Sequence, residues 1–244
     1  VYTISVDTNA PLLTETIVGS AKKITNTSIV FGGEASDGNE ITITQGEQTW
    51  QTTVTDGKWA IELPLKSENS QIADGNHDFV ITVTDRNNKT NQITRTVTVD
   101  TVSPAITEPS VTTIDKKYTI NNVDYYGSSV IAIKATVEDA TTSIAAVEYA
   151  VTSTSEAPTE NASWSSMNMN VENSTATASS VVITATASSV VISEGFNYIW
   201  IRATDIAQNI SLVETPLIVK GDHTNPTASV YEIEGKQKVT GAIA

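Results

Sequence analysis

A short acidic junction recurs along the chain and constrains its fold more than any other feature. It reads ISVDTNAP at residues 4–11, VTVDTVSP at 97–104 and IVKGDHTNP at 218–226. Asp100 follows Asp7 by 93 residues, and Asp222 follows Asp100 by 122 residues. A landmark that returns at such long intervals indicates repeated domains rather than one enzyme fold. We therefore expect tandem modules joined by short, stiff, acidic linkers.

The junctions divide the chain into four parts. We expect residues 1–7 to be the last strand of a preceding repeat or an N-terminal strand, and residues 8–101 to form a first β-sandwich. Residues 102–221 would form a second sandwich, and residues 222–244 the incomplete start of a third. Each complete module is long enough to bury its own core. In an alternative interpretation, the first strand pairs with a neighbouring molecule.

Short alternating segments separated by turn residues run through both modules. In the first module, strand-like residues 48–55 and 59–64 flank Asp56-Gly57, a strong hairpin signal because Gly adopts the positive φ that the turn requires. No segment shows convincing helical periodicity. Regular short strands of this kind are typical of a sandwich. The predicted fold class is all-β, with tandem immunoglobulin-like β-sandwich domains.

The second module contains a direct duplication, TATASSVVI twice, at residues 175–192. Its density of β-branched residues favours two paired strands over a poorly ordered insert. A repeat of nine residues reverses the faces between copies unless a bulge intervenes.

A second internal match aligns the two modules. EGFNYIWIRATDIAQN (194–209) mirrors DGNHDFVITVTDRNNK (74–89). When Asp205 is aligned with Asp85, the alternating apolar residues of the two segments coincide. Ile199, Ile201 and Ala203 then correspond to Phe79, Ile81 and Val83. We infer that both modules share one architecture.

The charge of the chain excludes several kinds of partner. There are 28 acidic and 14 basic residues, a net charge of −14. This argues against nucleic acid, whose phosphates require clustered Lys and Arg, and against anionic membrane surfaces. It is compatible with cation binding and with an extracellular surface.

Cysteine is absent, so core packing, metal ions or both must stabilise the sandwiches. No apolar run approaches the roughly 18 residues of a membrane span.

Several segments resemble the bacterial immunoglobulin-like repeats of large surface adhesins: GGEASDGNEITIT, DGKWAIELP, DGNHDFVITVTD and VDTVSP. The resemblance covers the first module almost wholly and, in the second, VEYAV, Trp164 and residues 194–219. It implies a secreted or surface-anchored bacterial protein in which strings of repeats form stalks. The chain departs from the family after the Thr-Asp, where a Gly-Asn pair is common and Asn87-Asn88 or Gln208-Asn209 stands here.

Calcium at the junctions is the sharpest chemical expectation, because many related repeats bind it there. Ca²⁺ takes six to eight oxygen ligands. We expect Asp85 and Asp100 to converge with an acidic residue of the next module at one boundary. The counterparts would be Asp205 and Asp222 at the second boundary and Asp7 at the first end; Asp37, Asn39 and Asp139 are further loop candidates. The alternative is that these aspartates cap their own turns.

A second candidate site is aromatic. If Ile199 and Ile201 face the core, then Tyr198, Trp200 and Arg202 point to the opposite face of that strand. An exposed Tyr-Trp pair beside Arg202 would stack on a sugar ring or receive a protein partner. In the alternative interpretation, the duplicated insert or the edge of the first module covers this face.

Catalysis finds little support in the sequence. A triad needs a nucleophile, a base and an orienting acid in contact, whereas His77 and His223 lie far apart in the module plan. We therefore expect no enzyme but a non-catalytic, extracellular repeat module of the bacterial cell surface, forming a rigid adhesin stalk with neighbouring repeats as partners. The alternatives are a subunit of a self-assembling surface layer or filament, and a carbohydrate-binding accessory module of a secreted enzyme. The further partners would then be other copies of the chain, or a host or surface glycan or protein.

Overall fold

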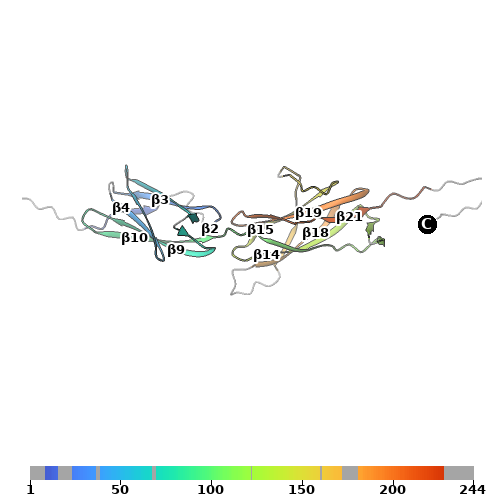
Figure 1. Ribbon diagram of the computed structural model, residues 1–244, viewed down its shortest axis with the longest axis horizontal. Coiled ribbons are helices and arrows are strands. Elements are labelled where there is room, and N and C mark those ends of the chain that lie inside the picture. The colour runs from blue at the N-terminus through green and yellow to red at the C-terminus, as the bar shows by residue number, and fades with distance from the viewer. Residues whose placement is uncertain are drawn as a thin grey trace, which may run out of the picture.

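The computed structural model describes residues 9–15, 24–36, 39–67, 70–121, 123–159, 161–171 and 181–227. All regular secondary structure within these residues consists of β-strands, which confirms the all-β fold class. Figure 1 shows two sandwiches lying end to end, with β10 leading out of the first and β14, β15 and β19 in the second. Residues 1–7 and the segment after Thr227 lie outside the described residues.

The first module consists of two sheets packed face to face. One has the order β1-β3-β6 and the other the order β2-β10-β9-β4-β5, with β7 and β8 forming a separate hairpin. The strands are β1 Leu13–Glu15, β2 Ile24–Thr25, β3 Ser28–Ala35, β4 Glu40–Gln45, β5 Gln48–Thr53, β6 Lys58–Pro64, β7 Lys66–Ser67, β8 Ser70–Gln71, β9 Gly75–Thr84 and β10 Thr90–Val99.

Alternation places the core of this module between its sheets. Phe31 of β3 and Phe79 of β9 are fully buried, and their ring centroids lie 5.2 Å apart. The predicted turn at Asp56-Gly57 is confirmed: both residues have positive φ, 54° and 75°, and Thr55 and Lys58 exchange backbone hydrogen bonds. The flanking strands do not continue as a paired hairpin, because β5 pairs with β4 and β6 pairs with β3 in the other sheet.

The second module has the same two-layer plan with extra strands. One sheet has the order β11-β14-β18-β17, and the other the order β12-β13-β21-β19-β15-β16, with β20 also pairing β19. The strands are β11 Ala105–Val111, β12 Lys117–Ile120, β13 Val123–Tyr126, β14 Val130–Asp139, β15 Ile144–Thr152, β16 Ser165–Ser166, β17 Asn168–Val171, β18 Val181–Val191, β19 Gly195–Asp205, β20 Ile210–Leu212 and β21 Leu217–Gly221.

The buried apolar residues form two separate clusters, one in each module. The alignment of β19 on β9 agrees with burial, because Ile199, Ile201 and Ala203 are as fully buried as their counterparts Phe79, Ile81 and Val83. The shared pattern of the two modules therefore reflects a shared inward face.

Within the described residues, the duplicated segment forms one strand and not two paired strands, so the prediction is wrong there. Residues 181–191, which join the end of the first copy to the second, are one continuous strand, β18, paired with β14; residues 172–180 lie outside the described part. Ile131 faces Val190 but Ile133 faces Ala187, so β18 carries one extra residue there. This bulge restores the inward face, and Ile183 and Ile192, nine residues apart, are both buried.

The outgoing linker of each module is held by a carboxylate at the start of β9 or β19. Asp74 accepts hydrogen bonds from the backbone N–H and the hydroxyl of Thr101, both at 3.0 Å. Glu194 accepts one from the N–H of His223 at 3.1 Å. We call these two contacts the exit clamps. The glycine after each carboxylate, Gly75 or Gly195, has positive φ, which lets the turn bring the carboxylate against the linker.

Candidate metal centre

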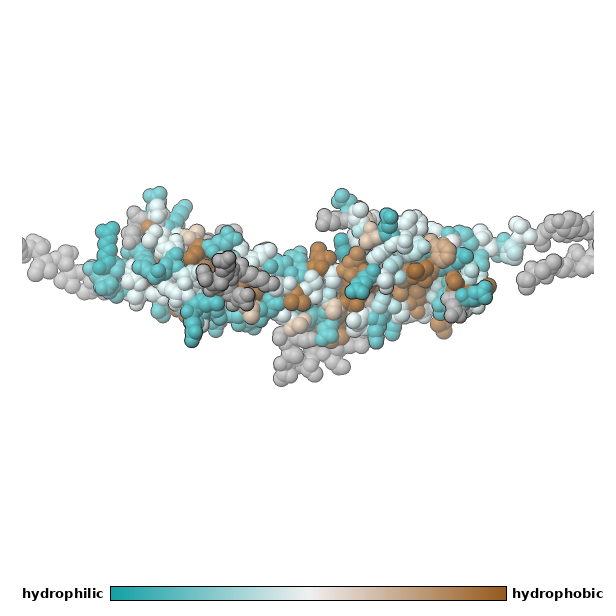
Figure 2. Space-filling model, viewed as in Figure 1, coloured by the Kyte–Doolittle hydropathy of each residue, from teal (hydrophilic) through white to brown (hydrophobic). Residues whose placement is uncertain are grey.

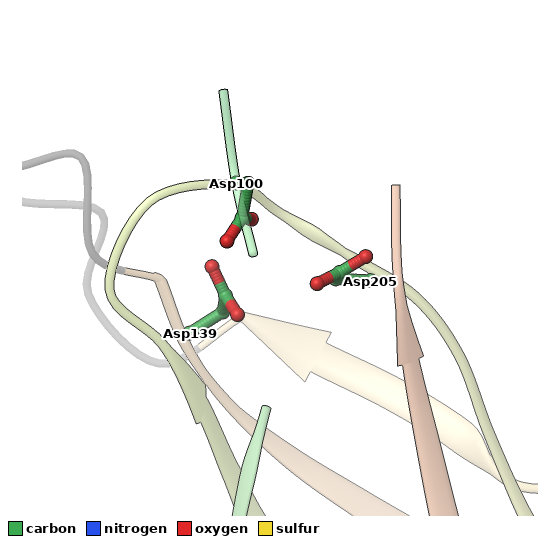
Figure 3. Close-up of side chains that lie close together, drawn as sticks. All are labelled: Asp100, Asp139 and Asp205. Atoms are coloured by element: carbon green, nitrogen blue, oxygen red, sulfur yellow. The ribbon is translucent and has the colours of Figure 1, made fainter. Parts of the chain in front are cut away.

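Three buried carboxylates meet where the two modules join. Asp100, Asp139 and Asp205 each offer an oxygen, and these oxygens all lie within 4.8 Å of one another. Asp100 is 0% exposed, Asp139 2% and Asp205 0%. Figure 3 shows the three carboxylates pointing toward a common space. Asp100 comes from the junction after β10, whereas Asp139 and Asp205 end β14 and β19 of the second module.

The strand alternation that builds the core also positions this site. Val137 and Asp139 are successive inward residues of β14, and Ala203 and Asp205 are successive inward residues of β19. Asp139 and Asp205 thus continue the inward face beyond the last apolar layer. Asp100 reaches them because its N–H donates to the carbonyl of Thr25 at 2.9 Å, which fixes the chain as it leaves β10.

Local hydrogen bonds orient each carboxylate. Asp139 Oδ1 accepts from the N–H groups of Thr141 and Thr142 at 2.9 and 2.6 Å. The Thr142 hydroxyl donates to Asp100 Oδ2 at 2.5 Å and so connects the second module to the junction. Asp139 Oδ2 is buried and has no hydrogen-bond partner. The turn-capping role considered for aspartates is therefore present, yet it leaves one buried oxygen unused.

Among the described residues, no cationic side chain forms an ion pair with Asp100, Asp139 or Asp205. Ion pairs in the described part of the chain lie elsewhere, for example at Arg95–Glu15, Lys117–Asp124, Arg202–Glu148 and His223–Glu194. Burial raises the pKa of the Asp100 carboxyl; hydrogen bonds from Thr142 and Val102 lower it, and the charges of Asp139 and Asp205 raise it again. At an effective dielectric constant of about 20, two unit charges 4.8 Å apart repel by about 3.5 kcal/mol.

The donor set fits a hard divalent cation. Carboxylate oxygens from three chain segments suit Ca²⁺ or Mg²⁺, whereas a site without Cys or His does not favour zinc. Asp139 Oδ2 is available as a ligand without breaking a hydrogen bond. Water and backbone oxygens would complete the six to eight ligands of Ca²⁺.

Asn209 belongs to this site, although the sequence pointed to it only as part of a departure from the family pattern. Its Nδ2 donates to Asp205 Oδ2 at 2.8 Å and to the backbone carbonyl of Asp100 at 2.9 Å. Its N–H donates to Asp205 Oδ1 at 2.9 Å. Its position four residues after Asp205, at the end of the polar turn, was the available signal.

The structure brings together Asp100 and Asp205 of the predicted residues, with Asp139 from the loop candidates. The expected convergence of Asp85 with Asp100 is wrong. In the antiparallel pair β9–β10, Thr84 faces Thr90 and Gly75 faces Val99, so Asp85 and Asp100 lie at opposite ends, about 30 Å apart along the strand. Asp85 Oδ1 caps its own turn through the N–H groups of Asn87 and Lys89.

Asp205 and Asp222 are likewise separated, because Gly221 faces Gly195 at the far end of β19. At the described junction between the two modules, Asp100 therefore meets Asp205, the turn aspartate of the following module, and not Asp85 of its own module. Asp7 and Asp37 lie outside the described residues. Asn39 is buried, and together with Asp85 it lines an open pocket.

The exposed surface considered at Tyr198, Trp200 and Arg202 is not formed, in agreement with the alternative that this face is covered. Trp200 is 5% exposed and belongs to the core cluster, against which Tyr198 and Trp164 also pack. The Arg202 guanidinium binds Glu148 at 2.7 Å and lies 4.3 Å from the centre of the Trp164 ring. The described part of the duplicated segment is not the cover, because β18 belongs to the other sheet.

No protein-family model matches the sequence, and no curated protein is similar to it. Among solved structures, fibronectin(III)-like modules of Clostridium thermocellum CbhA share 14% identity, with a TM-score of 0.38, over 84% of this chain and 92% of that one. Tandem repeats from the extending region of a large adhesion protein share 17% identity (TM-score 0.34; 82% of this chain, 46% of that chain).

A 1.5-MDa bacterial ice-binding adhesin gives 13% identity and a TM-score of 0.38, over 86% of this chain and 62% of that chain. These low scores say nothing about what the present chain binds. Within the described residues, no helix is long and apolar enough to cross a membrane.

Proposed function

We propose that this chain is a non-catalytic repeat segment of an extracellular bacterial protein, forming part of a stalk whose modules are held in line by Ca²⁺ at their junctions. The observation that carries the proposal is the cluster of three buried carboxylates contributed from both sides of one junction, with an oxygen of Asp139 left without a partner. A buried charge cluster is costly unless it is paired or coordinates a metal.

The protein contacts around the cluster already restrict bending. Asp74 holds Thr101 on the side of the first module, and Asn209 holds the Asp100 carbonyl on the side of the second. The first two of the five residues between β10 and β11 are thus held, one from each module. A cation on Asp100, Asp139 and Asp205 would remove their repulsion and add a direct connection between the junction and two strands of the second module.

The experiment is small-angle scattering of the chain with millimolar CaCl₂ and with excess chelator, together with thermal unfolding under both conditions. We expect a larger and better-defined maximum dimension with calcium. A ligand that binds only the folded state at about 100 times its dissociation constant adds about 2.7 kcal/mol of stability. Asp139→Asn, which removes the unpartnered oxygen's charge, should lose both responses, while Asp85→Asn serves as the matched control. Identical behaviour with and without calcium would contradict the proposal.

A further inference from the structure

A row of side chains crosses four strands on the outer face of the larger sheet of the second module. Tyr118 of β12 faces Tyr125 of β13, Tyr125 faces Lys220 of β21, and Lys220 faces Phe196 of β19. Directly opposed residues on neighbouring strands point to the same side of a sheet. We call these four residues the aromatic row. It spans three strand spacings, about 14 Å.

Each member of the aromatic row contacts the next member across the sheet. The rings of Tyr118 and Tyr125 are stacked, with centroids 5.4 Å apart and planes inclined by 8°. The Lys220 ammonium lies 4.8 Å from the centroid of the Tyr125 ring and 5.0 Å from that of Phe196. Cation–π contacts on both sides of Lys220 hold the rings in a continuous arrangement.

The row is accessible and has apolar neighbours. Phe196 is 50% exposed and Tyr118 38%. Beside them, Ile218 and Ile120 are 60% and 51% exposed. Figure 2 shows that the second module displays more hydrophobic surface than the first. Contiguous exposed apolar side chains on a protein this polar mark a place of contact.

Polar groups border the rings. Asp222 accepts a hydrogen bond from the Tyr118 hydroxyl, and this bond, first among the causes, raises the pKa of Tyr118 to about 12. At the β12 end of the row, Lys117 pairs with Asp124 at 2.8 Å. Tyr118 also lines an open pocket of about 730 Å³, together with Asp222, His223 and Asn225, which is within the size range of ligand sites.

We propose that the aromatic row binds a neutral oligosaccharide, laid across β12, β13, β21 and β19. A pyranose ring offers an apolar C–H face to an aromatic ring and hydroxyl groups at its edge to carboxylates and ammonium groups, and the row provides both kinds of partner. This activity goes beyond the proposed role in a stalk, which does not require it.

Charge argues against the other occupants. Two copies of the chain, each with a net charge of −14, repel one another. The same charge repels a polyanionic glycan. A protein partner with a wide apolar face would bury the Lys220 ammonium and the Asp222 carboxylate, which is costly unless they are newly paired. A neutral ligand with hydroxyl groups leaves both charges hydrogen-bonded.

The test is isothermal titration calorimetry of the full chain with cellohexaose, laminarihexaose and mannohexaose. We expect at least one to bind with a millimolar or lower dissociation constant. Phe196→Ala and Tyr118→Ala should each weaken that binding about tenfold, which corresponds to about 1.4 kcal/mol. Ile210→Ala, which removes a side chain of 59% exposure outside the row, is the matched control and should bind as the unaltered chain does.

Thermal unfolding of each variant shows whether its fold is retained; if Tyr118→Ala is unfolded, Phe196→Ala decides. The proposal is overturned if none of the three hexasaccharides binds at millimolar concentration, or if both ring variants bind undiminished. Sedimentation velocity provides a third outcome: self-association that Phe196→Ala abolishes would identify a second copy as the occupant instead.

Discussion

The side-chain amide of Asn26 donates a hydrogen bond to Oδ1 of Asn209 at 3.1 Å, although 183 residues separate the two in the sequence. Asn26 precedes β3 of the first module, and Asn209 follows β19 of the second. Because Asn209 also binds the Asp100 carbonyl and the Asp205 carboxylate, a single side chain connects both modules and the junction between them.

Asn209→Ala removes one side-chain hydrogen bond within the second module, to Asp205, and two that lead out of it, to Asp100 and Asn26. It should therefore destabilise the second module by about 1 kcal/mol, since each hydrogen bond contributes about 1 kcal/mol net, and should also loosen the junction. Urea unfolding measures the first effect and small-angle scattering the second. Asn26→Ala removes only the bond between modules and should loosen the junction without changing the stability of the second module. Equal stability losses in both variants would contradict this division of roles.

Asp139→Asn should have opposite effects on stability with and without calcium. In excess chelator it removes one of three mutually repelling buried charges, so the melting temperature should rise or stay level. In saturating CaCl₂ it removes a ligand, and the melting temperature should fall relative to the unaltered chain. Calorimetric scans in both buffers measure the two differences. A loss of stability of the same size in both would show a purely structural role for Asp139.

The raised pKa of Asp100 gives a prediction for pH dependence. A carboxyl whose pKa is higher in the folded state than in the unfolded state binds more protons when folded. Its contribution to stability is complete below the unfolded value and is lost as pH rises through the folded value. In chelator, the unaltered chain should therefore lose stability relative to Asp100→Asn as pH rises from about 4. Parallel pH profiles of the two proteins would refute this.

Gln208→Gly should stabilise the second module by up to about 1 kcal/mol. Gln208 has a φ of 74°, a left-handed conformation that costs non-glycine residues roughly 1–2 kcal/mol, offset partly by the greater freedom of glycine in the unfolded chain. The corresponding turn of the first module contains Asn88, with a φ of 61°. Since asparagine tolerates this region better, Asn88→Gly should gain less. Urea midpoints of the two variants make the comparison.

The sequence predicted strands well because one inward face determines them. A strand was expected at residues 59–64 and these residues lie in β6, and the Asp56-Gly57 turn has the predicted conformation. The duplication was interpreted wrongly because β-branched density does not distinguish one long strand from two short ones. The register shift opposite Ile131 and Ile133 depends on pairing with β14, which the sequence of β18 alone does not contain.

The candidate site was predicted in its chemistry and only partly in its geometry. Asp100 and Asp205 were singled out as acidic residues after strands, and they meet. The partner assigned to Asp100 was wrong because strand direction, not distance along the sequence, decides which end of a sandwich a turn occupies. Whether Trp200 is covered was left open, because alternation assigns a side chain to a face of the sheet but does not say what covers that face.

The exit clamps have a consequence for the size of a long array. Asp74 with Thr101 and Glu194 with His223 use the same contact to set the direction in which the chain leaves each module. When every repeat fixes the direction of the next, the end-to-end length of the array grows in direct proportion to the number of repeats. A freely jointed array would grow only with its square root. In the proposed stalk, one carboxylate contact in each repeat would therefore determine how far the array extends.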